Sequence, residues 1–177
     1  MSNLTTDYFL LTTTPPKYIK MRIAIFPGSF DPITKGHEDI VRRALPLFDK
    51  IIVAFGINTN KQYFFTQEQR LDFARQTFAD VAHKVKIDTY TGLTAQYSSK
   101  VGADFMLRGV RNSTDFDYES TIAALNKMIG KGIETVFMMT SPEYAHYSST
   151  VVREILRGGE DPAAFLPAVV SQLIKNK

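Results

Sequence analysis

The sequence contains no cysteine among its 177 residues. A disulfide framework and a thiolate metal site are therefore excluded, and a cytoplasmic location is the simplest expectation. Apolar runs are short, and none approaches the roughly 20 residues that a helix needs to span a bilayer. The first twenty residues also lack the basic start and the long apolar segment of a signal peptide. We therefore expect no association with a membrane.

Two common phosphate-binding patterns are missing as well. The chain has neither the G-x-G-x-x-G dinucleotide fingerprint nor the G-x-x-x-x-G-K-[ST] P-loop. Its basic residues are scattered, although the net charge is +3 and the isoelectric point is near 9.0. A mildly basic surface suits anionic small molecules but gives no nucleic-acid footprint. We expect no nucleic-acid partner, and salt-sensitive binding of DNA or RNA would be needed to revive that alternative.

What the sequence does contain is a regular alternation of apolar, β-rich runs with helical patterns. The first, second and fifth apolar runs are nearly continuous, which is typical of parallel strands buried on both faces. The alternation predicts an α/β fold, a doubly wound five-stranded parallel sheet with right-handed crossovers. The candidate strands are residues 22–26, 50–57, 85–90, 104–108 and 133–139. The candidate helices are residues 37–45, 66–78, 93–101, 115–129 and 149–156, with one or two further turns after residue 161.

Length and composition fit one domain with a full core. Residues 1–20 are rich in threonine and contain two adjacent prolines. We interpret them as a poorly ordered N-terminal extension and residues 21–177 as the single domain. Met21 is then an alternative start site, which mass spectrometry of the native protein would exclude by detecting residues 1–20.

A first motif follows the first predicted strand, where residues 27–37 read P-G-S-F-D-P-I-T-K-G-H. Ligands of doubly wound sheets bind beyond the carboxyl ends of strands. Gly28 allows a tight turn or the close approach of a phosphate, and His37 falls at a helix start, which favours anions. Taken alone, each of these residues also has a purely structural explanation. The whole string resembles the [ST]-F-D-P-x-x-x-G-H signature of the nucleotidylyltransferase superfamily.

A second motif follows the fifth predicted strand, where residues 147–153 read Y-S-S-T-V-V-R. Consecutive hydroxyls at a helix start can hold phosphate oxygens together with backbone N–H groups. The alternative is that one of them is only an N-cap. The string resembles the I-S-S-[ST]-x-x-R motif of the same superfamily, so the resemblance implies its Rossmann-like nucleotidylyltransferase fold.

A third motif follows the fourth predicted strand, where residues 108–111 read R-G-V-R and residues 115–119 read D-F-D-Y-E. Two arginines three residues apart can hold two different phosphates, whereas isolated arginines more often form surface ion pairs. The string resembles the R-G-[LV]-R-x-x-x-D-F-[ED]-Y-E stretch of bacterial phosphopantetheine adenylyltransferases. Lys61 and the F-L-P at residues 165–167 match that family too. The resemblance runs from about residue 22 to the last predicted helix.

This resemblance implies transfer of the AMP part of ATP to 4′-phosphopantetheine, giving dephospho-coenzyme A and pyrophosphate in coenzyme A biosynthesis. It also implies Mg²⁺ held mainly through ATP phosphates without a protein metal site, a homohexamer, and inhibition by coenzyme A. The attacking phosphate is largely dianionic at neutral pH, because its second pKa is ~6. The reaction therefore needs no general base and no nucleophilic side chain, only a cationic, hydroxyl-rich site.

The resemblance further implies roles for individual positions. The catalytic candidates are His37, Lys61 and Arg108. The candidates for binding phosphopantetheine are Ser29, Lys61, Thr94 and Arg108. The candidates for binding ATP are Ser29, Phe30, His37, Gly109, Val110, Arg111, Glu119, Tyr144, Ala145, His146, Tyr147, Ser148, Ser149 and Thr150. Thr94 and Tyr144 depart from the residue types that are commonest at these positions in the family.

Two other interpretations fit the same fold. One is a nucleotidylyltransferase for nicotinamide mononucleotide or glycerol phosphate, although those families typically lack the string at residues 108–119. The other is a non-catalytic nucleotide-binding module, which loss of Gly36-His37 or of the paired arginines would have favoured. The adenylyltransferase hypothesis requires that His37, Arg111 and Ser149 share one cavity.

Overall fold

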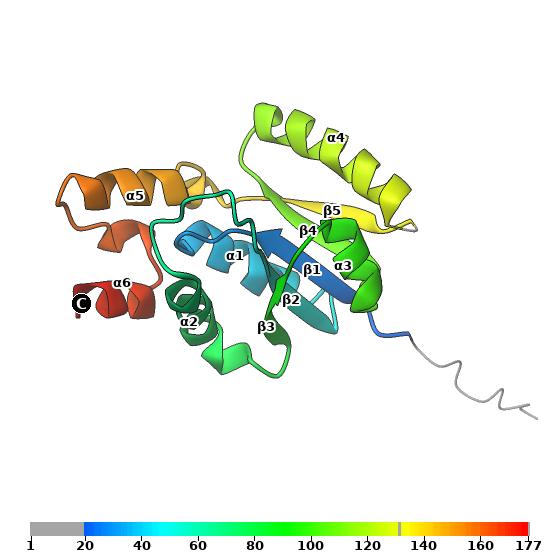
Figure 1. The fold of residues 1–177 in the computed structure, drawn as a ribbon, viewed down its shortest axis with the longest axis horizontal. Coiled ribbons are helices and arrows are strands. Elements are labelled where there is room, and N and C mark those ends of the chain that lie inside the picture. Colours follow the sequence, from blue (N-terminus) through cyan, green and yellow to red (C-terminus); the bar gives the residue numbers. More distant parts are fainter. Residues whose placement is uncertain (1–19, 131, 177) are drawn as a thin grey trace, which may run out of the picture.

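The computed structural model describes residues 20–130 and 132–176, so nearly all of the expected N-terminal extension lies outside the described residues. Five parallel strands form one sheet in the order β3-β2-β1-β4-β5 (Figure 1). This arrangement confirms the parallel sheet that the sequence predicts. The strands are β1 (Ile23–Gly28), β2 (Lys50–Gly56), β3 (Val85–Tyr90), β4 (Phe105–Val110) and β5 (Glu134–Met139).

Local sequence sets the ends of several helices. At the start of α2, the Thr66 hydroxyl accepts the N–H of Gln69 at 3.2 Å, and the Gln69 side chain accepts the N–H of Thr66 at 2.8 Å. This is a capping box. Two other helices begin two residues earlier than the sequence predicts, because Thr34 and Asn112 serve as their N-caps. The helices are α1 (Lys35–Ala44), α2 (Gln67–Thr77), α3 (Thr94–Lys100), α4 (Ser113–Ile129), α5 (Ser149–Arg157) and α6 (Ala168–Lys175).

Alternating side chains of the central strands supply two separate cores. Ala24 and Phe26 of β1 face a large core that includes buried residues of α1, α2, α5 and α6. Ile25, between them, faces a smaller core with Tyr97 of α3. In Figure 1, α3 and α4 lie together on one side of the sheet, and α2, α5 and α6 lie on the other. None of the helices in the described part of the chain is long and apolar enough to cross a membrane.

The fifth strand is less buried than its sequence predicts. Its apolar run predicted burial on both faces, but Glu134 and Met139 are exposed and the residues between them are only partly buried. The physical reason is position: β5 is an edge strand, and α4, which packs on β4 and β5, has no buried residue of its own. The prediction of a strand is confirmed, and the prediction of complete burial is wrong.

The strand order creates a switch point between β1 and β4. From β1 the chain moves outward to β2 and β3, and then returns to place β4 on the opposite side of β1. The loops that leave these two strands therefore run in opposite directions, which opens a crevice at their carboxyl ends. The first and third sequence motifs, at the ends of β1 and β4, come together there.

The end of β1 requires glycine because Phe30 folds back over it. A Cβ atom on Gly28 would lie 2.7–3.0 Å from carbons of the Phe30 ring. Phe30 has a φ of 42°, in a region that few non-glycine residues adopt. Its buried ring lies 4.9 Å from the ring of Phe55 and 5.1 Å from that of His37, measured between centroids. The close packing of the Phe30 ring therefore explains why residue 28 is a glycine.

Replacing Gly28 with alanine should lower the free energy of unfolding by about 1–3 kcal/mol, the usual cost of forcing a methyl group into a packed core. Urea unfolding measures this change. Gly158→Ala is a matched control, because its Cβ would lie no closer than 3.4 Å to another atom and its backbone is already helical. Equal free energies of unfolding of the two variants would show that packing of the Phe30 ring does not require glycine at position 28.

Candidate active site

A cavity of about 700 Å³ lies at the switch point, and all three sequence motifs contribute to its wall. His37, Arg111 and Ser149 share this cavity, as the adenylyltransferase hypothesis requires. The sequence-predicted residues that line it are Ser29, Phe30, His37, Lys61, Arg108, Gly109, Arg111, Glu119, Tyr147, Ser148, Ser149 and Thr150.

The other predicted contacts do not line this cavity, and they are Thr94, Val110, Tyr144, Ala145 and His146. The Val110 side chain is buried. The Thr94 hydroxyl lies 2.8 Å from the Tyr90 hydroxyl, at the first turn of α3. The rings of Tyr144 and His146 pack against that of Tyr147, which lines the cavity, with centroids 5.3 and 4.8 Å apart.

Several lining residues were missed by sequence reasoning, among them Thr34, Asp115, Tyr118, Thr140 and Arg153. Four of these lie inside the three motif strings, so a signal for them was present. Thr140 has no such signal. It follows β5 and reaches the cavity only because the sheet order brings its hydroxyl beside Gly109, 3.9 Å from the position of a Cβ there.

The His37 side chain is oriented by the turn that begins α1. Its Nδ1 accepts the backbone N–H of Thr34 at 3.0 Å. Because Nδ1 is the acceptor, the proton of the neutral ring belongs on Nε2, which leaves an N–H donor for a ligand. Burial lowers the pKa of His37 to about 4, and the positive charges of Arg108 and Arg111 add to this effect. At neutral pH, His37 is therefore an uncharged hydrogen-bond donor.

Two arginines of the cavity are each held by a carboxylate from α4. Arg108 donates through Nε to Glu119 at 2.7 Å and is paired with the same carboxylate through Nη2. Arg111 donates through Nε and Nη2 to Asp115 at 2.7 and 3.0 Å. Hydrogen bonding to Arg111 lowers the pKa of Asp115. The ion pairs that the sequence left as an alternative therefore exist, but inside the cavity wall, where they fix both guanidinium planes.

The hydroxyls at the start of α5 are divided between capping and tethering. Ser148 is the N-cap and accepts the N–H of Val151 at 3.2 Å. Ser149 donates to the carbonyl of Pro32 at 2.8 Å, which ties α5 to the first motif. The capping role that the sequence left open falls to Ser148, and the phosphate-facing role of these hydroxyls stays a prediction. Among the described residues, none accepts the N–H groups of Ser149 and Thr150, so these groups can meet an anion.

Lys61 enters the site from the loop between β2 and α2. Its Nζ lies 3.4 Å from the Ser29 hydroxyl and 5.5 Å from the centre of the Tyr63 ring. Among the described residues, no carboxylate forms a salt bridge with Lys61, in contrast to the two arginines. An incoming phosphate can therefore pair with this ammonium without first displacing a carboxylate.

Comparison with known proteins places this arrangement in a family. Residues 25–155 match the model of the cytidylyltransferase-like family. A phosphopantetheine adenylyltransferase of Flavobacterium psychrophilum is 47% identical over 150 residues, which are 85% of this chain and 98% of the relative. One of Cytophaga hutchinsonii is 49% identical over 146 residues, 82% of this chain and 97% of the relative. The chain belongs to the phosphopantetheine adenylyltransferase family.

A solved structure shares the fold of this adenylyltransferase family member. It is assigned as a nicotinate-nucleotide adenylyltransferase of Vibrio parahaemolyticus, and the two structures have a TM-score of 0.66 at 21% identity. The match covers 86% of this chain and 97% of the other. This likeness confirms the Rossmann-like nucleotidylyltransferase fold that the motifs predict.

The described residues of this phosphopantetheine adenylyltransferase family member contain no cluster of three or more His, Asp or Glu side chains that could hold a metal ion. The two carboxylates that line the cavity, Asp115 and Glu119, are both paired with arginines. A metal ion in this cavity would therefore take most of its ligands from a substrate.

Nitrogen NMR of the ligand-free protein should show His37 as the neutral Nε2–H tautomer, titrating at about pH 4. In the unfolded chain the same group titrates near pH ~6.5, so its contribution to stability should decline as the pH falls from ~6.5 towards its folded pKa. Titration of His37 near neutral pH, or a proton on Nδ1, would contradict this assignment.

Proposed function

We propose that this chain transfers the adenylyl group of ATP to 4′-phosphopantetheine, forming dephospho-coenzyme A and pyrophosphate in coenzyme A biosynthesis. The observation that carries the proposal is the convergence of a neutral donor, His37, with the cations Lys61, Arg108 and Arg111 in one cavity. Such a site stabilises phosphate charge and needs no nucleophile of its own. The names and high identities of the relatives support this choice of acceptor.

The chemistry is a direct displacement at phosphorus. An oxygen of the phosphopantetheine phosphate forms a bond to the α-phosphorus of ATP, and the bond from that phosphorus to the bridging oxygen of pyrophosphate breaks. No proton has to be removed from the attacking group, because a phosphate with a second pKa of ~6 is already ionised. His37 donates Nε2–H to the α-phosphate, where charge builds up in the transition state. Its low pKa makes it unsuited to act as a base.

The acceptor side of the site is formed by Ser29, Lys61 and Arg108. The ammonium of Lys61 and the guanidinium of Arg108 hold the phosphate of phosphopantetheine, and the Ser29 hydroxyl touches both substrates. Two observations support this division: Lys61 forms no salt bridge with any described carboxylate, and its Nζ donates to the Ser29 hydroxyl at 3.4 Å. Thr94 stays a prediction for the pantetheine arm, since it lies beside Tyr90 and outside the cavity wall.

The nucleotide side is formed by the start of α5 and the loop that follows β4. First-turn N–H groups, together with Ser149 and Thr150, face the triphosphate. Gly109, Arg111 and Glu119 line the nucleotide. ATP enters as its Mg²⁺ complex, with the ion bound mainly by phosphate oxygens and water, as is usual for Mg²⁺.

Copies of the chain associate, and the family resemblance favours a homohexamer. The exposed apolar side chains of α4 support association: Leu125, Met128 and Ile129 are 50%, 83% and 48% exposed. Sedimentation of a monomer at micromolar concentration would contradict this association.

Coenzyme A contains the adenylyl and pantetheine groups of the product, and it competes with the substrates for the same cavity. The enzyme acts in the cytoplasm.

Pyrophosphate release tests the proposed reaction. The protein is incubated with ATP, Mg²⁺ and either 4′-phosphopantetheine, nicotinamide mononucleotide, glycerol phosphate or no acceptor. We expect release only with 4′-phosphopantetheine. Release with another acceptor would assign a different nucleotidylyltransferase activity, and ATP binding without any release would favour a non-catalytic module.

His37→Ala and Lys61→Ala should affect different kinetic constants. Loss of the Nε2–H donor should lower kcat by about 10²–10³ with little change in either KM. Loss of the ammonium should mainly raise the KM for 4′-phosphopantetheine. Steady-state kinetics with each substrate varied measure the split, and Lys100→Ala, an exposed lysine of α3, is the matched surface control. An unchanged kcat in His37→Ala, or an effect of Lys61→Ala on ATP alone, would overturn these assignments.

A further inference from the structure

The loop between β1 and α1 is held by side chains from two other elements. The Ser29 carbonyl accepts a hydrogen bond from Arg70 Nη1 of α2 at 2.7 Å. The Asp31 carbonyl accepts one from Arg153 Nη1 of α5, also at 2.7 Å. The loop that carries Ser29 is therefore fixed from both sides, and the residue at its centre is Asp31.

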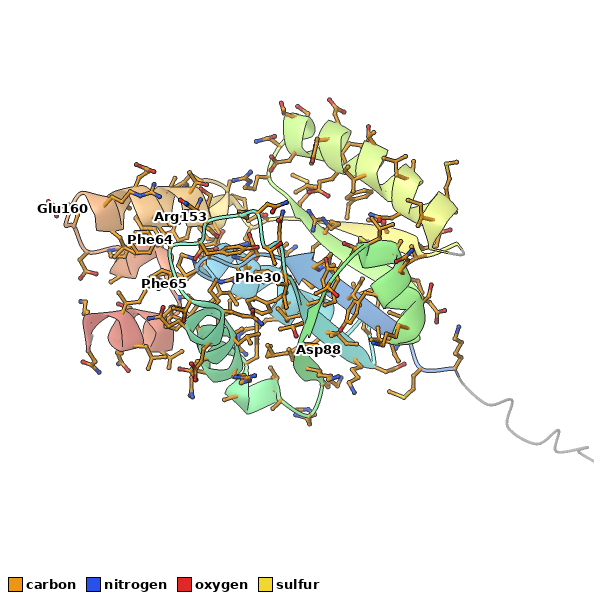
Figure 2. The ribbon with its side chains drawn as sticks, viewed as in Figure 1. Phe30, Phe64, Phe65, Asp88, Arg153 and Glu160 are labelled. Atoms are coloured by element: carbon orange, nitrogen blue, oxygen red, sulfur yellow. The ribbon has the colours of Figure 1, made fainter. Side chains whose placement is uncertain are left out.

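The Asp31 side chain makes a third attachment, to the loop that carries Lys61. Asp31 as a whole is only 2% exposed. One oxygen accepts the backbone N–H of Phe64 at 2.8 Å, and the other accepts that of Phe65 at 2.9 Å. Arg153 Nη1 approaches the carboxylate to 3.9 Å. Figure 2 labels Phe64, Phe65 and Arg153, which lie in the region between α2 and α5.

Arg70 strengthens the same attachment. It is buried, and its guanidinium carbon lies 3.8 Å from the centre of the Tyr63 ring while Nη1 holds the Ser29 carbonyl. Three consecutive residues, 63–65, are thus anchored to the first motif, directly after Gln62. Lys61 is two residues before the first of them, so its reach towards Ser29 depends on where this anchor holds the backbone.

We propose that Asp31 is a positioning residue, which sets Lys61 relative to Ser29 by holding the backbone N–H groups of Phe64 and Phe65. This inference rests on the proposed role of Lys61 in holding the acceptor phosphate. Asp31 does not line the cavity, so it acts through Lys61. A carboxylate is required because both of its oxygens accept, whereas an asparagine amide would turn N–H donors towards one of the two backbone N–H groups.

Asp31→Asn and Asp31→Ala should raise the KM for 4′-phosphopantetheine, by about ten-fold or more, because hydrogen bonds to a buried charged group are strong ones. The KM for ATP should change far less, and alanine should be worse than asparagine. Thr77→Val is the matched control: Thr77 is 4% exposed and donates to the Phe73 carbonyl at 2.7 Å, within α2 and away from the cavity. Thr77→Val should lower only the stability of the fold. It should therefore reduce the fraction of active protein and leave the KM values for ATP and for 4′-phosphopantetheine unchanged.

The double variant Asp31→Asn/Lys61→Ala gives the sharpest test. If Asp31 acts through Lys61, the double variant should have the same acceptor KM as Lys61→Ala alone. Additive effects of the two substitutions, or equal rises in the KM values for ATP and acceptor, would overturn the proposal.

Hydrogen exchange tests the anchor without depending on the reaction. In Asp31→Asn, the amides of Phe64 and Phe65 should exchange faster than in the original chain, while amides of β1 keep their protection. Unchanged exchange at both amides would also overturn the proposal. Should the original chain show no turnover with 4′-phosphopantetheine, the proposed function fails, and the exchange result still decides whether Asp31 holds this loop.

Discussion

The site depends on the parallel pairing of β1 with β4, two strands separated by more than seventy residues of chain. The pairing places Ala24 opposite Phe105 and Ile25 opposite Met106. It brings the ends of both strands to one edge, where Arg108 donates to the Pro27 carbonyl at 2.7 Å across the gap. Without this neighbour relation the first and third motifs would end at separate places on the sheet, and no shared cavity would exist.

The electrostatics of the cavity follow from placing three cations, Lys61, Arg108 and Arg111, around one imidazole. Burial of the imidazole, and then the positive charges of Arg108 and Arg111, lower the pKa of His37, so the ring stays neutral and can donate a hydrogen bond. Asp115 and Glu119 offset the arginines in the ligand-free protein. The cavity therefore carries little uncompensated charge before substrates arrive, apart from that of Lys61. These hydrogen-bonded pairs hold the two guanidinium groups in defined orientations at the cavity wall.

Much of the fold could be predicted from local patterns, because strand apolarity, capping residues and glycine stops are local properties. The capping box at Thr66 and the strands β2 and β3 are examples. The order of the strands in the sheet is not a local property, since it depends on which faces of distant segments pack together. Sequence therefore could not reveal that β5 is an edge strand, that Thr140 reaches the cavity, or that Thr94 turns towards Tyr90.

The same distinction applies to the site. Motif strings predicted most of the cavity wall, because the resemblance transfers whole strings of residues. They did not reveal which partner each side chain has. The contact of Asp31 with two backbone N–H groups more than thirty residues away has no signature in sequence, since any polar loop can supply such groups.

Phe30 marks the point at which the apolar interior becomes the wall of the site. Its ring packs against those of Phe26, Phe55 and His37. Protein interiors are close-packed and pass displacements on to their neighbours. A change of volume at Phe55, near the carboxyl end of β2, is thus only two ring contacts from the imidazole. A substitution that repacks the interior at this place should therefore also change the orientation of the His37 ring.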